Sequence, residues 1–343
     1  MGVDVGGTNA TVGIAGVADT SVKPLFSLRF NTQQLPSITP AVQQTLSYSK
    51  EEHQINVTSL CIGAAGVVSS SKTSVNLTNV AWDIDVQDIL NETPIGTAFI
   101  INDFQAVGYG LRFLDHSDTS DVIAVKATAN ADAFKMTKAV LGAGTGLGKS
   151  ILTYDNQNKV YIPVASEGGH GDFPVYNDFE QRLVNFVKQK RGTDEPVVYE
   201  EILSGRGVEH IYLFLKERGR YPDTEHTAEI ASASDRASLI SSYRTSDKAC
   251  AETMRLFAKF YGRCAKNFAL ECLPTGGFYI AGGIAPKNTE IFMGNEFLDE
   301  FTRAYQRSDV LNDIPIYIVV NYDVGLYGTF VAAMQHKIHT GTK

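Results

Sequence analysis

The chain has 343 residues, a net charge of −8 and an apolar fraction of 43%, which is more than one compact core needs and predicts two lobes. It contains no basic stretch, so neither nucleic acid nor an anionic membrane is an expected partner. No apolar run approaches the roughly 20 residues that cross a bilayer, and the N-terminus lacks the features of a secretory signal. We therefore expect a cytoplasmic protein.

The first hundred residues alternate short β-branched runs with stretches of helical character, which is typical of a mixed α/β lobe. A helix is predicted over residues 104–114, and further strands follow it. Helical segments then dominate from residue 178 to about 271, and the last apolar stripe has helical spacing. We predict an α/β fold with mixed sheets flanked by helices: a small domain at 1–112, a large domain at 113–322, and a C-terminal helix at 323–343 that returns to the small domain. The strands are predicted at 2–6, 11–17, 24–30, 59–68, 97–103, 121–126, 139–146, 149–154, 159–164, 277–284 and 314–320.

Four cysteines, Cys61, Cys250, Cys264 and Cys272, are scattered without any CxxC spacing or accompanying histidine cluster. This pattern predicts neither a zinc site nor a redox pair. We expect buried, inert thiols.

A first glycine turn separates two β-type runs near the N-terminus, in the segment Val3, Asp4, Val5, Gly6, Gly7, Thr8. Backbone amides and the Thr8 hydroxyl in such a turn can bind phosphate oxygens. Asp4 would then lie near a phosphate-bound Mg²⁺ and contact it through water. A plain hairpin turn with a solvated aspartate explains the motif equally well.

A second glycine turn contains Gly142, Gly144, Thr145 and Gly146, and it resembles a Walker A loop because it ends in Gly148-Lys149-Ser150. Ala143 stands where that pattern needs glycine, and the following residues read as two strands joined by a polar turn at 155–159. A P-loop is therefore disfavoured. The density of glycines still favours contact with phosphate over an ordinary turn.

A third turn, at Gly282-Gly283, ends an apolar strand, where small residues would admit a flat base or a ribose. Close packing of a helix on the strand is the alternative. By itself this turn carries little weight.

Asn102 and Asp103 end an apolar strand, at the edge of the sheet where α/β proteins usually bind ligands. Phosphoryl transfer needs one carboxylate to orient and deprotonate the attacking hydroxyl. An Asn-Asp pair before a helix is also an ordinary N-cap, and for the dipeptide in isolation capping is the better explanation.

Glu167 and His170 come from one glycine-rich loop and suit a polyol, because a carboxylate accepts from two hydroxyls and imidazole donates or accepts. A surface loop is the alternative, and two ionisable groups without a third ligand argue against a metal. Asn79, near the only tryptophan, suggests a sugar-lining loop, although Trp82 is more often core. Glu200 could reach a sugar hydroxyl, but acidic residues near a helix start are common.

Taken in order, the motifs DVGGTN, LTNxxW, IIND, GAGTGLG, EGGH, EEILSG and FYIAGGI resemble the bacterial-type glucokinase family, within the hexokinase, actin and Hsp70 ATPase superfamily. The resemblance spans nearly the whole chain. It implies the two-lobed actin-like (ribonuclease H-like) fold with a central cleft, Mg-ATP as donor, glucose 6-phosphate as product, a role in glycolysis and a homodimer. The related repressor/kinase family carries a cysteine-rich zinc motif that is absent from this sequence.

Carried over by position, the resemblance makes Asp103 the general base and assigns Asn79, Asn102, Asp103, Glu167, His170 and Glu200 to glucose. The turns at 3–8 and 142–148 become the phosphate loops, and Gly282-Gly283 becomes the adenosine loop. The alternatives are a kinase for mannose, glucosamine or another hexose, and a non-catalytic ATP-responsive module of the same superfold.

Overall fold

The structure is a computed structural model that describes residues 1–18, 21–77, 80–128 and 135–340. Contacts between residues divide the chain into two compact units. Unit 1 comprises Met1–Asp115, Leu152–Ala165 and Asn321–Lys343, and unit 2 comprises His116–Ile151 and Ser166–Val320. The boundaries predicted from the sequence place 152–165 in the large domain. In the structure the Gln105 side chain donates to the Pro163 carbonyl over 3.1 Å, and this contact lies within unit 1.

Unit 1 is built on a five-stranded mixed sheet with the strand order β3-β2-β1-β4-β8. The hairpin β1-β2 is antiparallel, whereas β1, β4 and β8 run parallel. The carboxyl ends of β1 and β8 therefore lie at the same edge of the sheet, which brings the first glycine turn to the edge that carries Asn102-Asp103. The strands are β1 (Gly2–Val5), β2 (Asn9–Ala18), β3 (Ser21–Asn31), β4 (Ser59–Ala64) and β8 (Thr97–Asn102).

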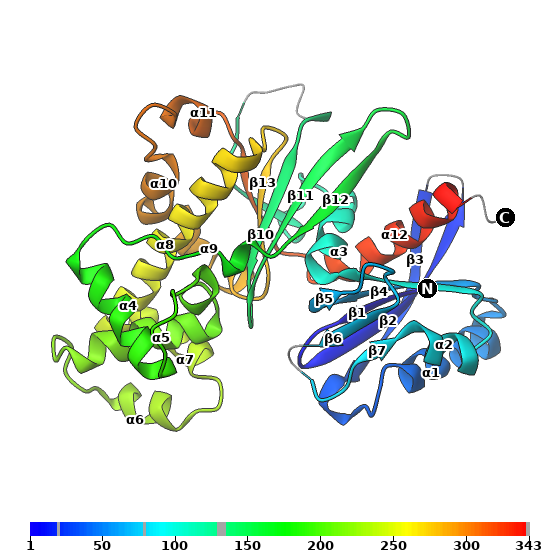
Figure 1. The fold of residues 1–343 in the computed structure, drawn as a ribbon, viewed down its shortest axis with the longest axis horizontal. Helices are drawn as coiled ribbons and strands as arrows, with labels where there is room; N and C mark the ends of the chain where they lie inside the picture. The colour runs from blue at the N-terminus through cyan, green and yellow to red at the C-terminus, as the bar shows by residue number, and fades with distance from the viewer. Residues whose placement is uncertain (19–20, 78–79, 129–134, 341–343) are drawn as a thin grey trace. The chain divides into compact units, whose positions relative to one another are not determined.

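Helices cover both faces of this sheet: α1 (Thr39–His53) and α2 (Val86–Glu92) lie on one face, and α3 (Asp103–Gly110) and α12 (Val324–Thr340) on the other (Figure 1). Successive strand side chains point to opposite faces. Leu60 and Ile62 accordingly join the core under α1 and α2, whereas Cys61 joins the core under α3 and α12.

Glycines allow α12 to lie close to its neighbours. Gly2 and Gly13 are paired across β1 and β2, and a Cβ on either would lie within 2.8 Å of the Phe330 ring. A Cβ on Gly328 would lie 1.7 Å from the Ala106 carbonyl oxygen on α3. The apolar stripe of the C-terminal segment is thus buried against both the sheet and α3.

The strand predicted over 59–68 is two strands, β4 and β5 (Gly66–Val68), which belong to different sheets. The chain turns at Gly66, whose φ of +138° suits only glycine and whose Cβ position would meet the Asn76 carbonyl oxygen at 2.3 Å. A small antiparallel sheet follows, with β6 (Ser74–Leu77) between β5 and β7 (Ile84–Asp85). Its strands are too short to show a period in the sequence.

Unit 2 is built on a six-stranded sheet ordered β12-β11-β10-β13-β14-β9. The first five strands in this order repeat the arrangement of unit 1. In each sheet, three strands consecutive in sequence run from the edge inward in reverse order, and two later strands lie beside the first of the three. Both predicted phosphate turns therefore occupy the same position, between the first and second strands of their sheets. The strands are β9 (Val122–Lys126), β10 (Lys138–Ala143), β11 (Leu147–Asp155), β12 (Val160–Ser166), β13 (Phe278–Ala281) and β14 (Ile316–Val319).

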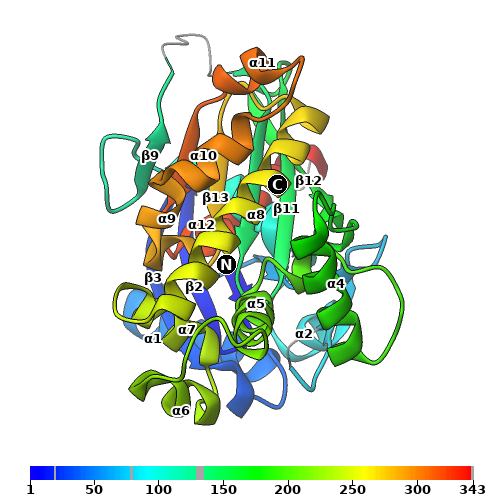
Figure 2. The same cartoon turned by 90° about the vertical axis from the view of Figure 1, so that its left-hand side faces the viewer.

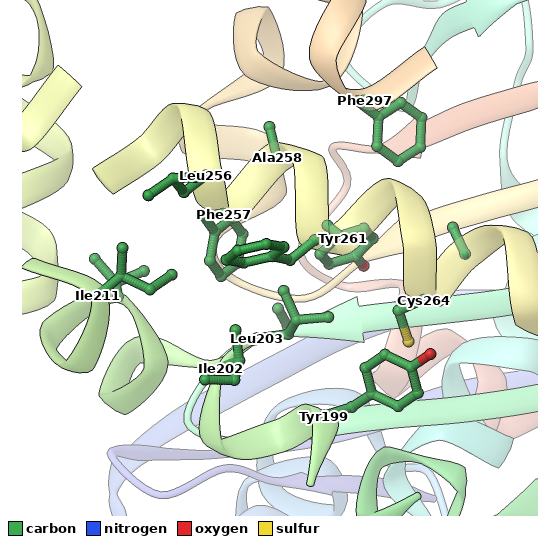
Figure 3. Close-up of a cluster of buried hydrophobic side chains, with 14 of the residues drawn as sticks. Tyr199, Ile202, Leu203, Ile211, Leu256, Phe257, Ala258, Tyr261, Cys264 and Phe297 are labelled. Carbon is green, nitrogen blue, oxygen red and sulfur yellow. The ribbon is translucent and has the colours of Figure 1, made fainter. Parts of the chain in front are cut away.

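Helix α8 is the centre of the core of unit 2, and 16 of its 25 residues are buried. Its Tyr261 hydroxyl donates to the Leu141 carbonyl of β10 over 2.8 Å. Figure 2 shows α8 with α9 and α10 along one side and α4 and α5 along the other, and Figure 3 shows its buried side chains facing Ile202 and Leu203. The helices are α4 (Asp178–Arg191), α5 (Gly205–Glu217), α6 (Glu225–Ser232), α7 (Arg236–Ser242), α8 (Lys248–Cys272), α9 (Thr289–Met293), α10 (Asn295–Thr302) and α11 (Ser308–Asn312).

Within the described residues, none of the helices is long and apolar enough to span a bilayer.

Candidate active site

The first glycine turn connects β1 to β2 and is held by its carbonyl groups. Thr32 donates two hydrogen bonds to the turn: its amide to the Thr8 carbonyl and its hydroxyl to the Gly6 carbonyl, each over 2.9 Å. The Gln33 side chain donates to the Gly7 carbonyl over 2.7 Å. Among the described residues, none accepts a hydrogen bond from the amides of Gly7 and Thr8, so these donors are available to an anion.

Asp4 lies just before this turn, with its carboxylate against Gly325 at the start of α12. A Cβ on Gly325 would lie 3.0 Å from Asp4 Oδ2, so a larger residue there would press on the carboxylate. The pKa of Asp4 is raised to about 7, mainly because the group is withdrawn from water and further because Asp103 and Asp323 place negative charge nearby. Asp4 and Asp103 therefore share one acidic region of unit 1.

We predict that Asp4→Asn stabilises the ligand-free protein at pH 8 and has little effect at pH 4. An unfolded aspartate has a pKa near 3.8, so between about pH 4 and pH 7 the folded state binds more protons and its stability falls as pH rises. Asparagine removes this penalty. Thermal unfolding at pH 4, 6 and 8 without nucleotide or Mg²⁺ measures the effect, and an equal shift at all three values would contradict it.

Asn102 and Asp103 mark the junction between β8 and α3. The Asn102 side-chain oxygen accepts from the amides of Phe104 and Gln105, and Gln105 closes a capping box, so the N-cap explanation is correct for Asn102. Its side-chain NH₂ group is then what Asn102 offers to a ligand. Asp103 is the first residue of the helix and is half-buried; its Oδ1 accepts from the Phe104 amide over 3.0 Å.

In unit 2, the second glycine turn is tied to Glu200. The Leu147 amide donates to Glu200 Oε2 over 2.9 Å, and a Cβ on Gly146 would lie 2.5 Å from that same oxygen. The Gly205 amide, at the start of α5, donates to the Gly144 carbonyl over 2.9 Å. A predicted sugar ligand thus supports a predicted phosphate loop directly.

The loop that carries Glu167 and His170 lies on the other side of Leu147. Gly169 approaches so closely that a Cβ would meet the Leu147 carbonyl oxygen at 2.0 Å. His170 Nε2 lies 3.8 Å from Glu167 Oε2, and both side chains are about 60% exposed (59% and 62%). The Tyr199 amide donates to the Gly171 carbonyl over 2.9 Å. The structure therefore brings together the loops of Glu167, His170 and Glu200, three predicted hexose ligands.

We predict that Gly146→Ala weakens hexose binding, because the new methyl group would displace the Glu200 carboxylate from the Leu147 amide. A displaced Glu200 would lose its charge-assisted hydrogen bond to the sugar, which corresponds to roughly a tenfold rise in the dissociation constant of the hexose. Isothermal titration with glucose and no nucleotide measures this. Gly16→Ala is the matched control, since a Cβ there would meet no heavy atom within 4 Å; equal affinities in the two variants would refute the prediction.

The predicted adenosine loop lies beside the second phosphate turn. β10 and β13 are parallel neighbours, with Gly142 opposite Ala281. Gly282 has a φ of +84°, and its Cβ position would lie 2.5 Å from the Ala143 carbonyl oxygen, so glycine is required. A Cβ on Gly283 would meet no heavy atom within 4 Å, which leaves open space on that side.

The resemblance to a Walker A loop is not reflected in the structure. Residues Leu147–Asp155 form strand β11, and a polar turn leads to β12, as predicted. Lys149 is only 4% exposed and points between the rings of Tyr199 and Phe268. A P-loop lysine has to reach phosphate, and this one is buried among aromatic side chains.

The predicted site residues fall on both units. Unit 1 carries Val3, Asp4, Val5, Gly6, Gly7, Thr8, Asn102 and Asp103, and unit 2 carries Gly142, Gly144, Thr145, Gly146, Glu167, His170, Glu200, Gly282 and Gly283. Asn79 lies outside the described residues. No sequence pattern marks Gly325, Asp323 or the backbone of Leu147, because their roles depend on contacts between distant segments.

The profile of the family described as Glucokinase matches residues 1–336. A glucokinase from Nostoc punctiforme is 31% identical over 346 aligned residues, which cover 97% of this chain and 98% of that protein. The chain belongs to the glucokinase family. It is therefore an enzyme that phosphorylates glucose at the 6-hydroxyl at the expense of ATP, as the motifs predicted.

Solved structures agree on the fold of this glucokinase family member. The crystal structure of glucokinase from Balamuthia mandrillaris in complex with glucose superposes with a TM-score of 0.79 at 21% identity, covering 97% of this chain and 92% of that one. A ROK family glucokinase from Streptomyces griseus, in complex with glucose and AMPPNP, gives 0.60 at 21% identity, covering 97% and 98%. The predicted two-lobed actin-like ATPase fold is confirmed.

Proposed function

We propose that Asp103 is the general base of this glucokinase. The observation that carries the proposal is its position: it begins α3 at the end of β8, close enough to Asp4 for its charge to raise the pKa of that carboxyl. A carboxylate at the first turn of a helix is stabilised by the helix dipole. Asp103 also lies beside the turn proposed to bind phosphate, where a proton acceptor for the attacking hydroxyl is needed.

The proposed hexose ligands are Asn102, Asp103, Glu167, His170 and Glu200, with Asn79 as a further member. Asn102 donates through its side-chain NH₂ group, whereas Glu167 and Glu200 accept from hydroxyls. Glu200 already accepts from the Leu147 amide, so its other oxygen is the one that would face the sugar. Such a set rejects sugars that lack a matching hydroxyl, because its own polar atoms would remain unpaired.

The proposed nucleotide ligands are the amides of the two glycine turns, with Gly282-Gly283 against the adenosine. The side chain of Asp4 fits a hydrated Mg²⁺, because it lies just before the proposed phosphate turn and beside the negative charges of Asp103 and Asp323. Mg²⁺ would neutralise charge on the phosphoryl oxygens. Among the described residues no group of three or more histidine, cysteine or acidic side chains could hold a metal alone, which suits an ion bound mainly by phosphate and water.

In the proposed mechanism, Asp103 accepts the proton of the 6-hydroxyl as that oxygen attacks the γ-phosphorus. The bond between the γ-phosphorus and the bridging oxygen breaks, and ADP leaves. The amides of Gly7, Thr8 and the second turn stabilise the transferring charge, and the hexose ligands hold the hydroxyl in line.

A coupled assay for ADP release tests the proposed function. We expect release that depends on glucose, falls to background with 6-deoxyglucose, and prefers ATP over ADP or polyphosphate as donor. Faster turnover of mannose or glucosamine would instead make the chain a kinase for that hexose. Release of ADP without any sugar would indicate the non-catalytic or ATPase alternative.

We further propose that the enzyme acts in glycolysis in the cytoplasm as a homodimer. All four cysteines are free thiols, and burial raises the pKa of Cys250, Cys264 and Cys272 to about 12, so they stay protonated. Sedimentation at micromolar concentration tests the dimer.

A further inference from the structure

Lys149 is an unusual buried cation. It is 4% exposed, and among the described residues no carboxylate oxygen lies within 4.0 Å of its ammonium group. Its Nζ lies 5.2 Å from the centroid of the Tyr199 ring and 5.1 Å from that of Phe268. A buried ammonium is costly without a compensating partner, and here two aromatic faces and the nearby Cys264 thiol provide the compensation.

The same side chain lies directly beneath the glycine loop that carries Glu167 and His170. A Cβ on Gly168 would meet Lys149 Cδ at 2.9 Å and its Nζ at 3.3 Å. No larger residue fits at position 168 while Lys149 keeps this position. The loop therefore rests on the lysine.

Lys149 also contacts the segment that carries Glu200, through Tyr199. The Asn267 side chain donates to the Tyr199 hydroxyl over 2.7 Å, so the ring is fixed from α8 at one end and faced by Lys149. Figure 3 shows Tyr199 and Cys264 pointing toward one another beneath α8. Tyr199 is bonded to the other loop as well, since its amide donates to the Gly171 carbonyl.

We infer that Lys149 is a positioning residue for the hexose site: its side chain is a common support for the Gly168 loop and the Tyr199 turn, and sets the spacing between Glu167, His170 and Glu200. The inference rests on the proposed hexose ligands. It gives the lysine of the Walker-like segment a role toward the sugar rather than toward ATP.

Lys149→Met tests the inference, because methionine has a similar length and no charge. We expect the KM for glucose to rise about tenfold or more and the KM for ATP to stay within about twofold. Lys266→Met is the matched control: Lys266 is equally buried at 5% on α8, but it donates to the Arg303 carbonyl and faces the Tyr176 ring, neither of which belongs to a proposed ligand loop. An unchanged KM for glucose, or equal rises for both substrates, would overturn the inference.

A second variant, Gly168→Ala, keeps the test valid if Lys149→Met folds poorly. Gly168→Ala pushes the lysine away while keeping its charge, and should also raise the KM for glucose. If Lys149→Met folds, the double variant should raise the KM for glucose by less than the product of the two single-variant factors, because both substitutions act through one contact. A rise equal to that product would refute the inference. A wild-type enzyme without glucose-dependent turnover would instead refute the proposed function.

Discussion

Asp103→Asn should lower kcat by about 10²- to 10⁴-fold, which is the usual contribution of general base catalysis, and leave the glucose dissociation constant within about threefold. Asparagine has the shape of aspartate, and its side-chain oxygen can still accept from the Phe104 amide, so the start of α3 should be preserved. Single-turnover kinetics give the rate, and titration calorimetry gives the affinity. Near-native turnover would exclude Asp103 as the base.

The chain contains a matched control for this substitution. Asn177-Asp178 begins α4 in the same way that Asn102-Asp103 begins α3, with the asparagine as N-cap and the aspartate as the first helical residue. Asp178→Asn therefore removes the same charge from the same position of a helix. We expect it to leave kcat within about twofold; comparable losses in both variants would mean that the Asp103 effect arises from the helix start.

Arg263→Met should be the most destabilising of the single substitutions considered. Arg263 is fully buried and bonds to two buried carboxylates, those of Glu180 at 2.7 and 2.9 Å and Glu300 at 3.0 Å, and to the Pro174 carbonyl at 2.8 Å. Burial alone would raise the pKa of Glu180, but hydrogen bonds from Arg263 and from the Tyr176 amide outweigh it and lower that pKa. Without the arginine both carboxylates stay buried and lose their charged hydrogen-bond donor, although Glu180 keeps the Tyr176 amide and has Lys259 at 3.9 Å; we expect a cost of about 3–5 kcal/mol.

Urea unfolding at pH 7 measures this loss, with Arg255→Met as the control. Arg255 also pairs with a glutamate at 2.7 Å, but its side chain is 43% exposed, so its removal should cost no more than about 1 kcal/mol. Equal shifts of the midpoint would contradict the prediction. Because the lowered pKa of Glu180 favours the folded state above the unfolded pKa near 4.5, the wild-type advantage should shrink as pH falls through and below that value.

The sequence was sufficient for the main sheets because their strands are long, apolar and bounded by glycine turns. It was insufficient where one strand ends and the next begins within a single apolar run. Ala64 and Gly66 lie in one apolar run, yet they belong to different sheets, and only the backbone conformation of Gly66 shows where the strand ends. The three short strands that follow carry no periodic pattern to detect.

The site was predictable by motif but not by local chemistry. Asn102-Asp103 and Asn177-Asp178 are the same dipeptide at the same helical position, so no local feature separates a proposed base from an ordinary helix start. What separates them is the sheet: β8 and β1 end at one edge and bring Asp103 to Asp4. Likewise, the burial of Lys149 depends on Phe268 and Tyr199, which are remote from it in sequence.

The packing of α12 on β1, β2 and β4 has a consequence for synthesis on the ribosome. The glycine-lined face of that sheet emerges early, but the helix that covers it is translated only after the whole of unit 2. Until then α3 alone lies on this face, and the parts of Cys61, Phe99 and Ile101 that α12 covers stay exposed to water. We expect the second unit to fold first during translation, and the first to depend on chaperones until the closing helix arrives.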